Sequence, residues 1–144
     1  MKEETKKSII HYANMLKKRH NTNDPIAIAR AFNYIVWFPS DISTDFLKAT
    51  TRKKRDGSRL ITINSSYDEL SRKVLCAHEL GHIILGHKLK LEYGDKNISY
   101  EYGANLFAVA LLFDTDDFNI PITQMSNYIL KTILDKNVKD PTNR

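Results

Sequence analysis

The sequence predicts an α+β domain in which a short β-sheet packs against helices. Helix-type patterns occur near both ends of the chain, and strand-type patterns lie between them. The length of 144 residues fits one domain with one hydrophobic core. With 42% hydrophobic and 27% charged residues, the composition is that of an ordinary globular protein rather than a disordered or fibrous one. We therefore expect residues 1–144 to form a single domain.

The first part of the chain predicts two helices followed by a strand. Residues 3–18 have the apolar spacing of a helix. Residues 21–25 end this helix and cap a second one over 26–32, because a proline suits the first helical turn. Residues 34–38 are rich in β-branched and aromatic side chains, which predicts a strand that places Trp37 in the core.

A β-hairpin is expected next, around the turn signal Asp56-Gly57. Its strands are residues 46–50 and 59–64, with Ile61 and Ile63 on one face. A run of four basic residues, 52–55, precedes the turn and contributes to the formal net charge of +5. We interpret the run as a solvated hairpin tip. Direct nucleic-acid binding is not favoured, because no aromatic side chains are interleaved as a stacking surface.

Helices return in the second half of the chain. Ser66 and Glu69 have the spacing of a capping box, and the helix that they begin is expected to run to residue 85 and end at Gly86. A second helix is expected over 100–113, closed by the acidic residues 114–117. The last helix is expected at about 123–135, followed by a frayed tail.

Residues 78–82, HELGH, have the spacing of a zinc site on a helix. His78 and His82 are four residues apart, so they lie on one face and can converge on a single metal ion. Glu79 lies about 100° round the helix from His78, where it can reach an attacking water without binding the metal. The alternative, two core histidines and a surface glutamate, leaves unexplained why histidines occupy the face least needed for packing. Five residues project the other way, toward the core: Cys76, Ala77, Leu80, Ile83 and Ile84.

A zinc site of this kind needs a third protein ligand. Glu101 and Asn105 share one face of the following helix, and Ala104 and Ala108 would let that helix come close to the first. Glu101 is then a candidate ligand, and Asn105 is a candidate to orient a ligand imidazole from the second coordination shell. On spacing alone, other carboxylates compete with Glu101 for this position: Glu92, Asp95 and Asp114.

The segments 76–87, CAHELGHIILGH, and 101–108, EYGANLFA, together with Leu111-Leu112, resemble the ImmA/IrrE family of metallo-endopeptidases encoded by mobile genetic elements. The likeness covers about residues 25–115, which would form the core of a small zincin-like domain with HELGH on a central helix. The second family motif is similar to E-x-E/Q-A-N-x-F-A, and its first glutamate, a zinc ligand, maps to Glu101. The chain departs from the family at Gly103, where Glu or Gln is usual, and at 112–114, where Leu-Met-Pro is usual.

The resemblance implies a zinc-dependent endopeptidase that cleaves a helix-turn-helix transcriptional repressor and so relieves repression. A Zn²⁺ ion held by His78, His82 and Glu101 would activate a water molecule and polarise the scissile carbonyl, while Glu79 would carry the proton. The strand 60–64 is expected to hold the substrate by edge pairing. Candidate oxyanion donors are His87, Tyr100 and Tyr102.

A second function class remains open at this point, a non-catalytic zinc-containing module that binds or sequesters a repressor. Glu79 discriminates the two, because a structural zinc site has no use for a carboxylate beside the metal. We expect a cytoplasmic protein without a membrane partner: there is one cysteine, Cys76, no signal-like stretch, and the longest apolar run, 106–113, is too short to span a bilayer. Cys76 is expected to pack rather than to act as a nucleophile. The sequence does not indicate an oligomeric state.

Overall fold

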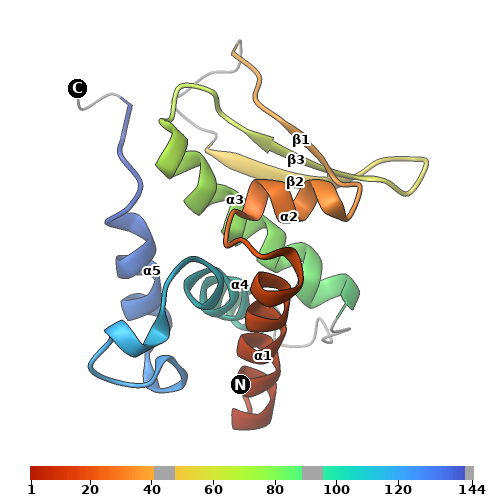
Figure 1. The fold of residues 1–144 in the computed structure, drawn as a ribbon. Helices are drawn as coiled ribbons and strands as arrows, with labels where there is room; N and C mark the ends of the chain where they lie inside the picture. Colours follow the sequence, from red (N-terminus) through yellow and green to blue (C-terminus); the bar gives the residue numbers. More distant parts are fainter. Residues whose placement is uncertain (41–47, 89–95, 142–144) are drawn as a thin grey trace.

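The computed structural model describes residues 1–40, 48–88 and 96–141. Figure 1 shows α3 as a central layer, with the sheet on one side and α1 and α4 on the other. This arrangement confirms the expected α+β class. The principal elements, in chain order, are α1 (Glu3–His20), α2 (Pro25–Ala31), β1 (Ile35–Trp37), β2 (Ala49–Lys53), β3 (Arg59–Ile63), α3 (Glu69–Ile83), α4 (Lys96–Leu112) and α5 (Asn127–Asp135).

The three strands form one sheet in the order β1-β3-β2. β3 pairs in parallel with β1 and antiparallel with β2, so it occupies the centre and has partners on both sides. The expectation that residues 60–64 bind a substrate by edge pairing is therefore wrong. Among the described strands, β1 and β2 form the two edges of the sheet, and β2 is the one that packs against α3.

The sheet buries one face against the helices. Ile61 and Ile63 of β3 are fully buried on this face, as their spacing predicts. In β1 only Val36 points inward, because neighbouring residues of a strand face opposite ways. Ile35 and Trp37 consequently lie on the outer face, and Trp37 is 53% exposed. The expectation that Trp37 belongs to the core is wrong.

The β2–β3 hairpin forms around the expected turn, but its strands extend further toward the tip. Gly57 has φ +91°, a conformation that suits glycine, and the Asp56 carboxylate accepts hydrogen bonds from the Ser58 backbone N–H and hydroxyl. Because β2 runs to Lys53, the first half of the basic run belongs to the strand rather than to the tip. The start of the predicted strand, residues 46 and 47, lies outside the described residues.

The termini of α3 differ from the prediction. Asp68 caps the helix, its carboxylate accepting from the Ser71 N–H at 2.8 Å, whereas Ser66 donates to the Asn64 side chain in the preceding turn. The predicted capping box is therefore wrong. Gly86 does not end the helix either, since the chain continues as a π-helical turn over Ile84–Lys88.

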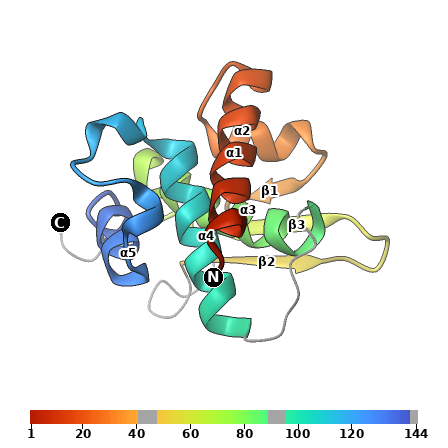
Figure 2. The same cartoon turned by 90° about the horizontal axis from the view of Figure 1, so that it is seen from below.

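α4 is the most deeply buried helix among the described residues. Every residue from Gly103 to Leu111 is buried. This burial results from the position of α4, which runs between α1 and α5 (Figure 2) and also packs on α3. The helix begins at Lys96, four residues earlier than predicted, and is followed by two 3₁₀ turns, Thr115–Asp117 and Ile122–Gln124, that lead to α5.

Within the described part of the chain, no helix combines the length and apolar character that a membrane span requires.

Candidate metal centre

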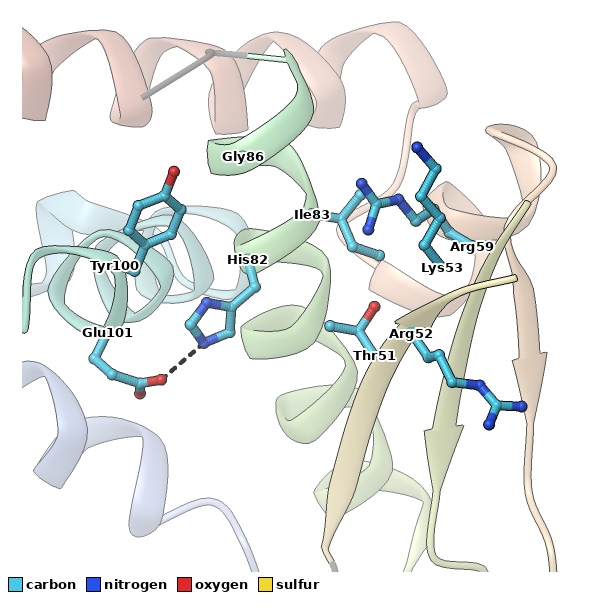
Figure 3. Close-up of a pocket in the computed structure, with 9 residues that line it drawn as sticks. All are labelled: Thr51, Arg52, Lys53, Arg59, His82, Ile83, Gly86, Tyr100 and Glu101. Carbon is cyan, nitrogen blue, oxygen red and sulfur yellow. Dashed lines mark ion pairs between the residues drawn. The ribbon is translucent and has the colours of Figure 1, made fainter. Parts of the chain in front are cut away.

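Three side chains from two helices meet at one point. His78 and His82 lie one turn apart on α3, and their Nε2 atoms are 3.1 Å from each other. Glu101, near the start of α4, places Oε1 at 2.9 Å from His82 Nε2 and Oε2 at 3.3 Å from His78 Nε2. Figure 3 shows Glu101 reaching from α4 toward His82 on the facing helix. The candidate ligands inferred from the sequence are thus brought together.

The geometry of this cluster fits a zinc ion. Zinc bonds of about 2.0–2.1 Å in a tetrahedron place neighbouring donor atoms about 3.3 Å apart. The three spacings here lie between 2.9 and 3.3 Å. Two imidazole nitrogens and one carboxylate are a donor set that zinc accepts, and three protein ligands leave a fourth position open, as catalytic sites require.

A chain of amides fixes the proton on His78. Asn105, buried on α4, donates from Nδ2 to the Asn127 side-chain oxygen at 2.7 Å. Its own oxygen therefore faces His78 Nδ1 at 2.8 Å, and an oxygen can only accept, so Nδ1 carries the hydrogen. The lone pair of His78 is then on Nε2, the atom that faces His82 and Glu101. Asn105 thus holds the ring of His78 in one orientation, and Asn127 holds the amide of Asn105.

Asn127 was not identified in the sequence. It is the first residue of α5, 22 positions beyond Asn105, and it belongs to neither motif. An asparagine after a serine looks like ordinary helix-start chemistry, and Ser126 is indeed the cap. No local pattern distinguishes an asparagine that also supports a distant site.

The surroundings of the centre affect the charges of its groups. Burial raises the pKa of Glu79 to about 7, and repulsion from Glu101 acts in the same direction. Burial also lowers the pKa of His82, supported by the nearby His78 and opposed by Glu101, which favours the neutral imidazole that binds metals. Glu79 is partly buried and is not one of the three residues whose atoms converge, namely His78, His82 and Glu101.

The close approach of α3 and α4 depends on two small residues that face each other. A Cβ added at Gly81 would lie 3.0 Å from both Cα and O of Ala104. Ala104 was expected to allow the approach, whereas the matching part played by Gly81 was missed. Gly103 faces Leu85 instead, and a Cβ there would meet the Leu85 side chain at 2.7 Å. At the position where the chain departs from the family motif, the neighbour of the glycine is thus the end of a side chain and not a backbone.

The other residues considered from the sequence lie elsewhere or outside the described part. Asp114 caps the 3₁₀ turn that follows the C-terminal end of α4, whereas Glu101 lies near the start of that helix. Tyr102 donates its hydroxyl to the Met125 carbonyl, away from the triad. Cys76 is fully buried, and burial raises the pKa of its thiol, as expected of a packing residue. Glu92, Asp95 and the side chain of His87 lie outside the described residues.

Two cavities flank the triad. The larger, about 550 Å³, lies on the His82 side and is lined by β2, the start of β3 and α4, with Tyr100 and Glu101 in its wall. The smaller, about 180 Å³, lies on the His78 side, and its wall combines the apolar residues Val74, Leu75, Leu134 and Val138 with charged ones, Lys48, Lys131 and Asp135. A chain laid across the triad would contact both.

Comparisons with known proteins relate the chain to one family. The family model Peptidase_M78, described as the IrrE N-terminal-like domain, matches residues 40–136. A curated phage protein, "Uncharacterized immunity region protein 2" of Bacillus phage phi105, is 30% identical over 102 residues, which are 67% of this chain and 63% of that protein. The aligned region thus spans less than two thirds of that relative. No solved structure matches the chain.

Proposed function

Because the chain belongs to the IrrE N-terminal-like (Peptidase_M78) family of metallopeptidases, we propose that it is a zinc-dependent endopeptidase that cleaves a helix-turn-helix transcriptional repressor. The observation that carries the proposal is the convergence of His78, His82 and Glu101 from two helices, with donor atoms spaced as in a zinc tetrahedron. A carboxyl group beside the ligands, Glu79, is what a hydrolytic site needs and a structural site does not.

Each residue of the site has a defined task in this proposal. Bound zinc would supply Lewis acidity toward a water molecule and the scissile carbonyl. The Glu79 carboxylate accepts a proton from the attacking water and then donates it to the leaving amine. Asn105 and Asn127 hold the His78 ring so that Nε2 faces the centre.

The substrate would lie in extended form along β2. Its open edge can pair with a peptide strand, and Thr51, Arg52 and Lys53 line the same cavity as His82 and Glu101. The peptide would then continue across the triad toward the cavity on the His78 side. In this proposal β2, rather than residues 60–64 as suggested by the sequence, holds the substrate by edge pairing.

The repressor as substrate is supported by family membership and by the phage relative. That relative is named as an immunity region protein of a phage. The test is to mix the zinc-loaded protein with the repressor encoded beside its gene and to look for one discrete cut by mass spectrometry. An intact repressor after incubation with the wild type would refute this substrate.

Metal binding is tested separately from cleavage. We expect one zinc per chain for the wild type by elemental mass spectrometry and a sharp loss for Glu101→Ala. Glu69→Ala is the matched control, because Glu69 is an exposed glutamate of α3 and pairs only with Lys73 among the described residues. In the cleavage assay, Glu79→Gln should retain zinc and lose the cut. If this variant still relieves repression in cells, the protein acts by binding the repressor rather than by cleaving it.

A further inference from the structure

A cross-strand pair of like charge lies beside the metal centre. Lys53 of β2 and Arg59 of β3 are directly opposite each other in the antiparallel register, so their side chains are on the same face of the sheet. Thr51 lies opposite Ile61 in that register, and Ile61 is buried against the helices. Because residues two apart along a strand share a face, the Lys53–Arg59 pair also projects to the helix side.

Both cations line the larger cavity together with His82 and Glu101. Figure 3 shows Lys53 and Arg59 next to each other beyond Ile83, whereas Arg52 is directed away from His82. The pair therefore belongs to the wall of the candidate active site. The tip residues Lys54 and Arg55 line a second cavity, which Lys53 borders as well but Arg59 does not.

The pair has no counter-charge in the described part of the chain. Like charges directly opposite on neighbouring strands destabilise a sheet, so such an arrangement calls for an anion. Neither Lys53 nor Arg59 takes part in any ion pair among the described residues. Glu101 also lines the cavity, but its two oxygens face the histidines. The anion is therefore expected to come from the bound molecule.

We propose that Lys53 and Arg59 form a subsite for an acidic side chain, Asp or Glu, of the peptide substrate. A strand paired along the edge of β2 directs alternate side chains to the helix side, where this pair lies. The planar guanidinium of Arg59 suits a two-point contact with a carboxylate, and the Lys53 ammonium adds a second charge. This inference rests on the proposed function, because it takes the ligand of the cavity to be a peptide.

The two sides of the cleft select different side chains. The cavity on the His78 side combines four apolar residues with charged ones, and of its two lysines Lys131 is paired with Asp135 at 3.0 Å, which leaves Lys48 as a single cation without an adjacent basic partner there. An acidic residue should therefore be preferred more strongly on the His82 side, where two cations lie together. This asymmetry gives the substrate a direction across the metal centre.

The test is a binding measurement on zinc-loaded Glu79→Gln protein, so that no probe is cut. The probes are labelled alanine-based peptide hydroxamates, whose hydroxamate group chelates zinc, with three neighbouring glutamates in one probe and three glutamines in the other. Each probe is made with the hydroxamate at either end, which samples both sides of the metal. With the hydroxamate at one end, we expect the glutamate probe to bind about tenfold more tightly at low salt, a ratio that shrinks as salt is added.

Three variants in the Glu79→Gln background decide the assignment. In Lys53→Gln/Arg59→Gln the ratio between the two probes should fall to about one. The matched control, Lys54→Gln/Arg55→Gln, removes the same charge from the hairpin tip and should keep the ratio. Lys53→Glu/Arg59→Glu should instead prefer a probe with three lysines. Zinc content and circular dichroism confirm that each variant is folded.

The proposal is overturned if the ratio is one for the parent protein, if it survives in Lys53→Gln/Arg59→Gln, or if neither probe binds. The outcome does not depend on proteolysis. A ratio that behaves as expected, together with a wild type that cuts no repressor, would retain the subsite and reject the proposed function. If the wild type cuts its repressor but the probe ratio does not depend on Lys53 and Arg59, the proposed function would be retained and the subsite rejected.

Discussion

Asn105 controls the centre without contacting the metal position. It accepts from His78 Nδ1 at 2.8 Å and donates to Asn127 at 2.7 Å, so removing its amide frees the ring and leaves two polar partners unsatisfied. We predict that Asn105→Ala weakens zinc binding by about 10- to 100-fold. Competition with a chromophoric chelator measures this affinity. Asn14→Ala, an exposed position of α1, is the control, and equal affinities for the two variants would contradict the prediction.

Glu79 gives the metal-free protein a specific pH dependence. Its pKa is raised from 4.5 to about 7 by burial and by Glu101, so the folded state holds a proton that the unfolded state releases earlier. This contribution to stability is complete below about pH 4.5 and is lost as the pH rises through about 7. We predict a fall in the free energy of unfolding on the order of 1–3 kcal/mol across this range.

Urea unfolding in the presence of EDTA, from pH 4.5 to 8, measures this loss. The control is Glu79→Gln, which cannot titrate at this position and should show a flatter profile over the same range. Parallel profiles for the two proteins would mean that Glu79 is not the group responsible. Zinc, added back, should reduce the difference because its charge favours the Glu79 carboxylate.

The residues of the candidate site differ in how much the sequence reveals about them. His78, Glu79 and His82 share one helical motif, and Glu101 and Asn105 share another, so local spacing is enough to find them. Asn127 has no such signal because it meets Asn105 only through the packing of α5 on α4. The burial predicted for Trp37 is wrong for a related reason. Its hydrophobicity suggests burial, but its exposure depends on which face of the three-residue strand β1 packs against the helices.

At the scale of elements, the periodicity of the sequence predicted the helices and the hairpin. Periodicity does not predict how these elements pack against one another. The position of β3 between β1 and β2 results from a parallel pairing with a strand more than twenty residues earlier, which no local pattern indicates. The end of α3 was misjudged because Gly86 is a common stop signal, and yet the chain continues through a π-helical turn. The start of a helix depends on a single capping side chain, and the cap of α3 is Asp68 rather than Ser66.

The contact between α3 and α4 is predicted to be sensitive to a single methyl group. In Gly81→Ala the new Cβ would meet the Ala104 backbone at 3.0 Å, so the helices must move apart. We expect a loss of about 1–3 kcal/mol in unfolding free energy and weaker zinc binding, because the ligands come from both helices. Chemical unfolding and zinc competition measure the two effects.

Gly103→Ala provides the comparison for this helix contact. Its Cβ meets the end of the Leu85 side chain, which can rotate, and alanine favours the helix by roughly 1 kcal/mol over glycine. We therefore expect a much smaller loss of stability, or none. If Gly103→Ala were the more damaging change, the packing account of the Gly81–Ala104 contact would be wrong.

For the molecule as a whole, the metal would act as a cross-link. Zinc bound to the folded chain joins α3 to α4 across a connection that includes residues 89–95, and binding to the folded state alone raises stability by mass action. Free zinc at a hundred times its Kd should add about 2.7 kcal/mol and raise the Tm accordingly. Thermal unfolding with zinc and with EDTA tests this, and His82→Ala should show no response. A similar Tm shift in that variant would indicate zinc binding elsewhere.

The hydrogen bond between Asn105 and Asn127 has a consequence for reading the sequences of relatives. A buried amide whose partner is lost is costly, so the two positions should be inherited together. A homologue that replaces Asn105 with an apolar residue is then expected to replace Asn127 as well, even if its HExxH segment is intact. Substitution at both positions would identify homologues that no longer bind the metal. The sequence of α5 would then indicate the loss of metal binding, in addition to the two motifs.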